Sequence, residues 1–168
     1  MKRFLRQWVP TFIIAIVASM VVRTYIVEAM VVPSGSMLPT IQIHDRVVVE
    51  KVMPLTSLHH GDIIVFRPPV QVEGYERFVK RLIGLPGDLI EVKEGFLFRN
   101  NEKVYESYIK EQMNYDFGPV SVPEGKYFFL GDNRNDSFDS HAWETPFVEK
   151  KALIGKVILN IPFHYLYR

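Results

Sequence analysis

The sequence predicts a mainly β fold, an antiparallel β-sheet domain preceded by one N-terminal transmembrane helix. A basic N-terminus leads into a long apolar segment that ends near Val32. After Thr40 the pattern changes to short runs of branched and aromatic residues separated by Gly, Pro, Asn and Asp, as is typical of strands and turns. The chain has 168 residues, of which 48% are hydrophobic, enough for one cored domain and a short appendage.

The N-terminal segment has the features of a membrane anchor. Its uninterrupted apolar part, residues 12–22, is short, but continuation to Val32 reaches the roughly 20 residues that a spanning helix needs. The basic residues lie before the apolar segment, which favours a cytoplasmic N-terminus in the cell membrane. The expected division is a cytoplasmic N-terminus at residues 1–7, a single-pass anchor at residues 8–32 and an extracytoplasmic domain at residues 33–168.

Two other interpretations of this segment stay open. A cleavable secretory signal also has a basic start and a short apolar core, and Val27-Glu28-Ala29 could serve as its cleavage site. A buried core helix could have the same length. Cleavage after Ala29 would leave the nearby PSGSM segment close to a new terminus, so we favour the retained anchor.

Composition excludes several classes of function. A net charge of +1 and the lack of a basic stripe argue against a nucleic-acid partner. Because there is no cysteine, disulfides, thiolate nucleophiles and cysteine-ligated metals are excluded. The HHGD run at residues 59–62 has no helical or hairpin spacing that would support a metal site. We therefore expect neither a metal nor another cofactor.

The body of the chain is expected to consist of short strands. FLFRNNEKVY predicts a hairpin with Asn100 and Asn101 at its tip, because asparagine accepts positive φ better than most residues. There is no internal repeat. The other runs with strand character are RVVVEKVM, DIIVFR, RFVKRLIG, DLIEVK, KYFFLG and LIGKVILNI.

The strand expected at residues 77–84 contains two cations among apolar residues. Alternation places Lys80 and Arg81 on opposite faces, so at least one of them is expected to be partly buried. A buried charge is costly unless it is paired or loses its proton, and lysine can lose its proton whereas arginine cannot. Desolvation would lower the pKa of Lys80 toward neutrality and make it a general base. On this strand alone, a lysine that reaches solvent at the strand edge is the stronger interpretation.

The PSGSM segment supplies a possible nucleophile for such a lysine. Gly35 would let the backbone approach a substrate closely, and Pro33 and Pro39 would stiffen the two flanks. Ser36 would attack, and its backbone N–H could help to hold the oxyanion. The hydroxyl of Ser34 could supply the second donor.

Four segments together resemble the motifs of bacterial type I signal peptidases. That family consists of membrane-anchored serine–lysine enzymes that remove signal peptides from exported proteins. The resemblance covers nearly the whole chain, includes the N-terminal anchor, and implies an antiparallel β-sheet catalytic domain of the signal-peptidase type. The matching segments are SGSMLPT at residues 34–40, GDIIVF at 61–66, FVKRLIGLPGD at 78–88 and GDNRNDSFDS at 131–140.

The resemblance implies a role for individual residues. Ser36 matches the acylated nucleophile, Lys80 the general base and Ser34 the side-chain donor to the oxyanion. Ser137 matches a hydroxyl that orients the lysine. The residues expected beside the substrate are Met37 and Pro39, and those expected to support the site are Arg81, Asp132, Asp139 and His141.

One position departs from the family pattern. His141 stands where the family usually has an arginine shortly after the motif's acidic residue, here Asp139. We expect Asp139 to pair with His141 or with Arg81. Pairing with a histidine would make stability or activity depend on pH near neutrality.

The expected substrates are secretory preproteins, bound as extended strands along a sheet edge and cut after small residues at positions −3 and −1. Membrane phospholipid is the other expected partner. A self-cleaving Ser–Lys peptidase that switches a DNA-binding protein would need an N-terminal pair of recognition helices, where this chain has the apolar segment. A membrane-tethered module that only binds peptides would not need Lys80 among apolar neighbours. A Ser–His–Asp hydrolase would favour GxSxG around the serine, which Ser36 lacks.

Overall fold

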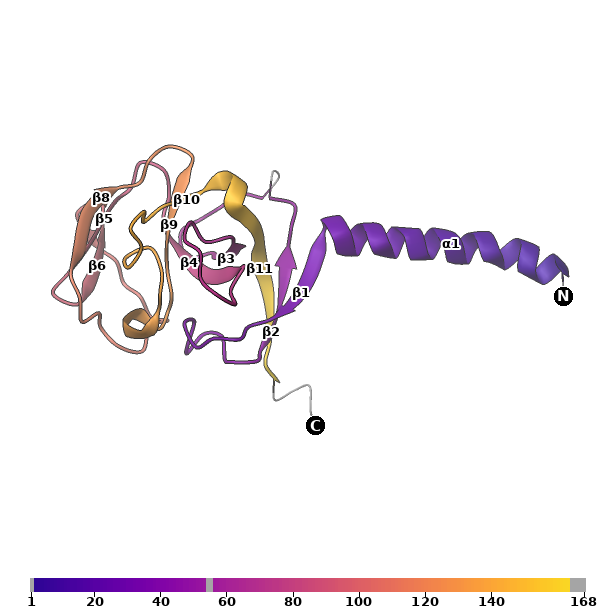
Figure 1. The fold of residues 1–168 in the computed structure, drawn as a ribbon, viewed down its shortest axis with the longest axis horizontal. Helices are drawn as coiled ribbons and strands as arrows, with labels where there is room; N and C mark the ends of the chain where they lie inside the picture. Colours follow the sequence, from indigo (N-terminus) through magenta and orange to yellow (C-terminus); the bar gives the residue numbers. More distant parts are fainter. Residues whose placement is uncertain (1, 54–55, 164–168) are drawn as a thin grey trace.

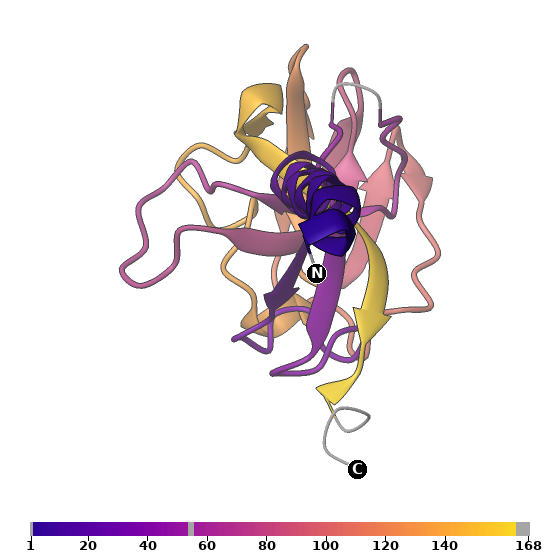
Figure 2. The same cartoon turned by 90° about the vertical axis from the view of Figure 1, so that its right-hand side faces the viewer.

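The computed structural model describes residues 2–53 and 56–163, in which one long helix leads into two antiparallel sheets (Figure 1). Helix α1 (Lys2–Tyr25) extends away from the sheets, and its C-terminal end meets strand β1 (Val27–Val31). Figure 2 looks along α1 and shows both sheets behind it. The mainly antiparallel β fold predicted from the alternating pattern is confirmed.

The end of the helix differs from the expected anchor. The prediction that the apolar segment continues as a helix to Val32 is wrong, because Val27–Val31 forms β1 and pairs with β2 (Arg46–Glu50) in antiparallel register. Within this strand Glu28 forms ion pairs with Lys51 and Arg77, so the sheet compensates its charge. The β domain therefore begins at β1, ahead of the expected boundary at residue 33. Over the part of the chain that the structure describes, no helix has the combination of length and hydropathy that a bilayer span requires.

The larger sheet contains seven strands, and all neighbouring pairs in it are antiparallel. Strand β1 forms one edge and β10 the other. In spatial order the strands are β1, β2, β11 (Leu153–Ile161), β3 (Ile63–Phe66), β4 (Phe78–Gly84), β9 (Lys126–Leu130) and β10 (Val148–Glu149).

The smaller sheet lies at the end of the domain opposite α1 (Figure 1). The expected hairpin is confirmed between its strands β6 and β7, where Asn100 and Asn101 have φ values of 56° and 67°. Two short 3-10 helices, η1 (Arg134–Asp136) and η2 (Lys150–Ala152), complete the elements. In spatial order the strands are β7 (Glu102–Lys103), β6 (Phe96–Arg99), β5 (Leu89–Lys93) and β8 (Phe117–Ser121).

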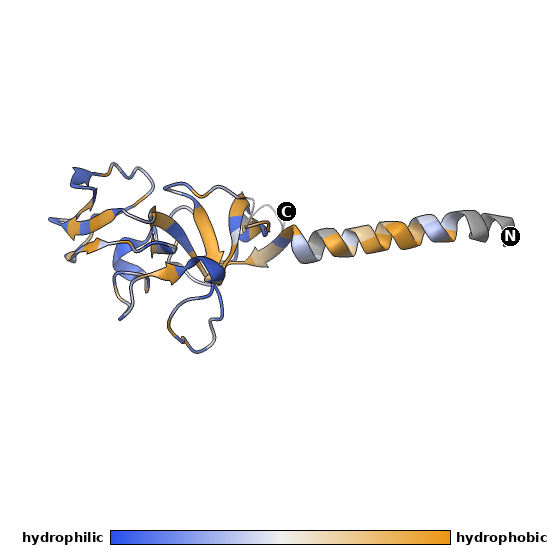
Figure 3. Ribbon diagram, turned by 90° about the horizontal axis from the view of Figure 1, so that it is seen from above, coloured by the Kyte–Doolittle hydropathy of each residue, from blue (hydrophilic) through white to orange (hydrophobic). Residues whose placement is uncertain are grey.

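Strand β4 runs between two apolar clusters of the core. Leu82 packs into a cluster with Phe66 and Phe129, whereas its neighbour Ile83 packs into a second cluster with Phe128. Figure 3 shows apolar residues concentrated on the strands and in the middle of α1. Because β4 is covered on both faces, polar side chains at its N-terminal half are also removed from water. This burial creates the electrostatic conditions of the site described next.

Candidate active site

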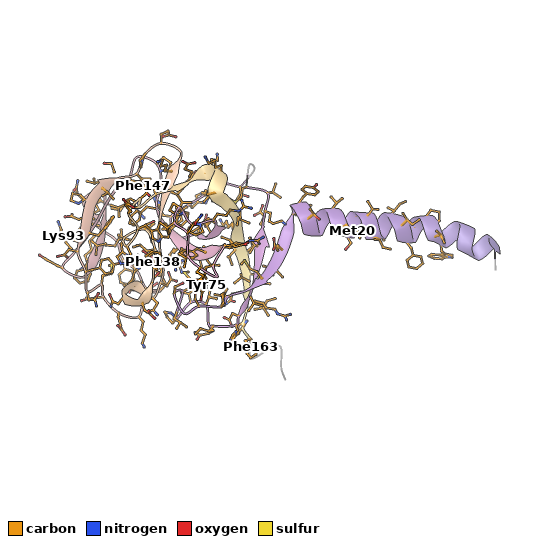
Figure 4. The ribbon with its side chains drawn as sticks, viewed as in Figure 1. Met20, Tyr75, Lys93, Phe138, Phe147 and Phe163 are labelled. Carbon is orange, nitrogen blue, oxygen red and sulfur yellow. The ribbon has the colours of Figure 1, made fainter. Side chains whose placement is uncertain are left out.

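A cavity of about 250 Å³ brings together side chains from three segments that are far apart in the sequence. Ser34 and Ser36 come from the loop after β1, Lys80 from β4, and Asp136 from η1. The aromatic side chains on its wall are partly exposed and include Tyr75 and Phe138, which are labelled in Figure 4. The two serines and the lysine that the sequence suggested thus share one cavity.

The loop that carries Ser36 is fixed by backbone contacts on both sides. Within the loop, Leu38 N–H donates to the Gly35 carbonyl at 3.1 Å. From the other side, Asn133 donates its backbone N–H to the Ser36 carbonyl at 3.0 Å and its side-chain amide to the Gly35 carbonyl at 3.1 Å. The Oγ atoms of Ser34 and Ser36 lie 3.4 Å apart. The nucleophile candidate is therefore held on a rigid turn beside a second hydroxyl.

Lys80 is buried, with only 4% of its surface exposed. Burial disfavours its charged form and lowers the pKa of Lys80 to about 8, against the opposing influence of the carboxylates of Asp139, Asp132 and Asp136. Its Nζ donates a hydrogen bond to Ser137 Oγ at 3.0 Å. The interpretation of Lys80 as a solvent-reaching lysine at a strand edge is therefore wrong. Among the described residues no hydrogen bond joins Lys80 Nζ to Ser36 Oγ. In substrate-free active sites catalytic hydrogen bonds are often long or poorly aligned, and they tighten when the substrate binds.

Ser137 connects the lysine to a buried carboxylate. Its Oγ donates to Asp139 Oδ2 at 2.5 Å, and the same oxygen accepts the Gly131 backbone N–H at 2.8 Å. The other carboxylate oxygen of Asp139 lies 2.7 Å from Nδ1 of His141. Asp139 is fully buried, so these contacts supply the hydrogen bonds that its charge requires.

Arg81 pairs with Asp132 and not with Asp139. Its Nε and Nη2 donate to the two oxygens of Asp132 at 2.7 and 2.5 Å, and its Nη1 donates to the Gly61 carbonyl at 2.7 Å. Thr40 Oγ1 also donates to Asp132 Oδ2 at 2.5 Å. Of the two partners expected for Asp139, His141 is the one observed. The Arg81–Asp132 pair, with its contacts to Gly61 and Thr40, instead links all four motif segments to one another.

The two residues expected beside the substrate do not line the cavity. Met37 is completely buried and packs in the core with Val32, Ile41 and Val65. Met37 packs between the loop and the core, so its side chain cannot contact a bound peptide in this conformation. Pro39 is exposed outside the cavity wall.

A group of residues from the segment between β7 and β8 supports the site without having been predicted from the sequence. Glu106 makes a buried ion pair with Arg134 of η1, with contacts of 2.5 and 2.6 Å. Tyr108 lies against the Arg81 guanidinium, whose Cζ is 3.9 Å from the ring centroid. Tyr115 stacks on the ring of His141. This segment has no periodic pattern, and only the arginine within the fourth motif could have suggested that a buried partner was needed.

The sequence profile of the family described as signal peptidase, peptidase S26, matches residues 5–161. The chain belongs to the signal peptidase family. Its membership supports a peptidase activity, and the recognition based on the four motif segments is confirmed.

Similar proteins within the signal peptidase family come from several bacteria. A probable signal peptidase I-2 of Synechocystis sp. is 40% identical over 154 residues, covering 89% of this chain and 70% of that protein. A signal peptidase I of Bacillus licheniformis is 38% identical over 168 residues, covering 92% of this chain and 87% of that protein. The crystal structure of a signal peptidase I from Enterococcus faecalis matches with a TM-score of 0.52 and 32% identity, covering 61% of this chain and 97% of that one. The β domain therefore has the signal peptidase fold.

Proposed function

We propose that this member of the signal peptidase family is a serine endopeptidase that removes signal peptides from exported preproteins, with Ser36 as nucleophile and Lys80 as general base. One observation carries the proposal. A buried lysine whose pKa is lowered to about 8 lies on the wall of the same cavity as a serine held on a rigid turn. A lysine of this kind can accept a proton near neutral pH, which an exposed lysine cannot do.

The reaction follows from the positions of these groups. Neutral Lys80 takes the hydroxyl proton of Ser36 while Ser36 Oγ attacks the carbonyl carbon of the scissile peptide bond. The Ser36 backbone N–H and the Ser34 hydroxyl donate to the oxyanion that forms. The Lys80 ammonium then gives its proton to the leaving amine as the C–N bond breaks, and an ester to Ser36 remains. Water, deprotonated by Lys80, hydrolyses this ester and releases the carboxylate product.

Ser137 acts in this scheme as a positioning residue. Its hydroxyl accepts from Lys80 Nζ and donates to Asp139, so both of its hydrogen bonds have a defined direction. A neutral amine has two N–H donors and one lone pair. One donor is used on Ser137, and the lone pair remains for the proton of Ser36.

We propose that the substrate binds as an extended strand beside β1, the edge strand of the larger sheet. Met30 of β1 and Val32 just after it line the cavity next to the two serines. Such an edge offers backbone donors and acceptors to an added strand, and shallow apolar pockets would select small side chains at positions −3 and −1 of the preprotein. Met37 has no direct part in this selection, because it is buried in the core.

We propose that α1 attaches the enzyme to the cell membrane through its exposed apolar side chains. Among the described residues of α1, ten large apolar side chains are exposed. Such a contiguous apolar surface is unusual on a soluble protein and fits contact with lipid. The large apolar side chains of α1 that are exposed are Trp8, Val9, Phe12, Ile13, Ile14, Ile16, Val17, Met20, Val21 and Tyr25.

The full chain is expected to float with phospholipid vesicles in a density gradient at both low and high salt. A double variant, Ile14→Asp and Val17→Asp, is expected to stay at the bottom of the gradient, because a charge in an apolar lipid contact costs about 2.5–3.5 kcal/mol. The matched control changes the exposed Tyr105 of the β domain to Asp. Flotation of the double variant equal to wild type would contradict attachment by α1.

The function is tested by incubating the purified full chain in lipid with a preprotein and reading the cut site by mass spectrometry. Wild type is expected to cut once, after a small residue, and Ser36→Ala is expected to lose about six orders of magnitude of activity. Ser121→Ala, an exposed serine on β8, is the matched control and should cut like wild type. A wild-type protein that binds the signal peptide without cutting it would favour the peptide-binding module instead.

A further inference from the structure

We infer that His141 is a positioning residue whose charge controls how readily Lys80 gives up its proton, acting through Asp139 and Ser137, and that Tyr115 holds the His141 ring in place. This inference rests on the proposed role of Lys80 as general base. It assigns a function to the position at which this chain departs from the usual arginine, and to a residue outside the family motifs.

A continuous chain of short hydrogen bonds joins His141 to the lysine. Nδ1 of His141 lies 2.7 Å from Asp139 Oδ1, Ser137 Oγ donates to Asp139 Oδ2 at 2.5 Å, and Lys80 Nζ donates to Ser137 Oγ at 3.0 Å. An ionised carboxylate only accepts, so the His141 Nδ1 carries the proton in this contact. Asp139 and Ser137, the two residues between His141 and Lys80, are both buried. A change of charge at His141 therefore acts on Lys80 through buried groups, where solvent screens it little.

Tyr115 fixes the His141 ring from the segment between β7 and β8. The two ring centroids lie 4.0 Å apart with an angle of 8° between the planes. The Tyr115 hydroxyl is buried and has no hydrogen-bond partner among the described residues. Because the hydroxyl makes no contact that would explain a tyrosine here, the ring face is the part of Tyr115 that matters to the site.

The charged groups packed around the His141–Tyr115 stack are Asp139, Arg134 and Glu106. Asp139 is fully buried beside it. Burial and the Asp139 carboxylate raise the pKa of Tyr115, so Tyr115 stays neutral. Behind Tyr115, Arg134 and Glu106 are paired with each other and act on Tyr115 with opposite signs. The His141 side chain keeps 18% exposure, which gives its proton access to solvent.

The sign of the coupling follows from simple electrostatics. The negative charge of Asp139 favours the protonated form of Lys80. A protonated His141 offsets that charge, so Lys80 loses its proton at lower pH. A neutral His141 leaves the Asp139 charge unopposed and holds the proton on Lys80 more tightly. An arginine at this position would offset the Asp139 charge at every pH. A histidine loses its positive charge as pH rises and then no longer offsets Asp139.

The test compares pH profiles of kcat/KM for the full chain in lipid, with His141→Arg as a permanent charge and His141→Gln as a neutral side chain. The ascending limb of His141→Arg is expected about half a pH unit below that of His141→Gln, for a charge acting over several ångströms in a partly buried site. The kcat/KM of His141→Arg divided by that of His141→Gln should therefore be about three at pH 7 and fall to a constant value above pH 9. Altered packing alone would give a ratio that does not change with pH, and that result would overturn the inference.

A second measurement does not depend on the folding of the His141 variants. Coupling is reciprocal, so removal of the Lys80 charge must raise the pH at which His141 loses its proton. The histidine ring resonances of wild type and Lys80→Met are followed by NMR across pH 5 to 8. An upward shift of the His141 midpoint by about half a pH unit is expected, and identical midpoints would overturn the inference.

The role of Tyr115 has its own matched pair. Tyr115→Phe keeps the stacked ring and should leave the pH profile unchanged, because the hydroxyl has no partner. Tyr115→Leu removes the ring face and should lower kcat severalfold with KM unchanged. A kcat equal to wild type in Tyr115→Leu would show that Tyr115 does not position the His141 ring. Failure of the proposed function itself would look different, since wild type would then not cut the preprotein or Lys80→Ala would remain fully active.

Discussion

Lys80→Met is expected to lower kcat/KM for preprotein cleavage about a thousandfold at pH 8, the typical loss on removal of a general base. Methionine keeps the length and burial of the side chain but cannot accept a proton. The measurement is single-turnover cleavage of a preprotein by the full chain in lipid. Lys93→Met is the matched control, because Lys93 lies in the smaller sheet and its side chain is 48% exposed. Activity within tenfold of wild type in Lys80→Met would mean that another group is the base.

The same lysine predicts the pH dependence of the wild-type enzyme. Burial lowers the pKa of Lys80 to about 8, and only the neutral amine can accept the Ser36 proton. The neutral fraction is therefore about one tenth at pH 7 and about one hundredth at pH 6. We expect kcat/KM to rise nearly tenfold per pH unit below pH 7 and to level off above pH 8.

Much of the site could be predicted because its residues lie in compact motifs. Ser34, Ser36 and the alternating strand around Lys80 are local patterns, and each motif sits in the element or loop expected from its sequence. The apolar residues on both sides of its strand left burial of Lys80 as one of two interpretations, and the strand alone favoured the other, a solvent-reaching lysine. The folded structure was needed to show that β4 is covered on both faces, which decided between a buried and a solvent-reaching lysine.

The errors have two physical causes. An apolar segment rich in valine fits a helix or a strand, and the antiparallel pairing of β1 with β2 decides the matter at Val27–Val31. Met37 follows the nucleophile in sequence, but the tight turn directs its side chain into the core and away from the cavity. Sequence order alone does not indicate on which side of a turn a side chain lies.

The residues that sequence reasoning missed come from the segment between β7 and β8. Glu106, Tyr108 and Tyr115 each contact a motif residue: Arg134, Arg81 and His141 respectively. Their neighbours in the chain have no periodicity that marks them as buried. The connection between β7 and β8 therefore contributes to the candidate site, although its residues lie far from Ser36 in the sequence.

The buried pair of Glu106 and Arg134 gives the largest expected effect on stability. The two side chains are 3% and 0% exposed, and Arg134 also donates to the Gly131 carbonyl in the motif that carries Ser137. Replacement of Glu106 by Gln keeps the shape but leaves a buried guanidinium without a counter-charge. Loss of one partner of a buried pair costs about 3–5 kcal/mol of unfolding free energy.

Glu106→Gln is therefore expected to lower the urea midpoint of the full chain strongly, whereas Glu111→Gln, an exposed residue of the same segment, should leave it unchanged. The double variant Glu106→Leu and Arg134→Met removes both charges and should recover most of the lost stability, because an apolar pair of similar volume needs no desolvation. It should not recover full activity, since the Arg134 contact to the Gly131 carbonyl is lost next to Asp139. A stability loss below about 1 kcal/mol in Glu106→Gln, the range of an exposed ion pair, would contradict this account of how the smaller sheet supports the site.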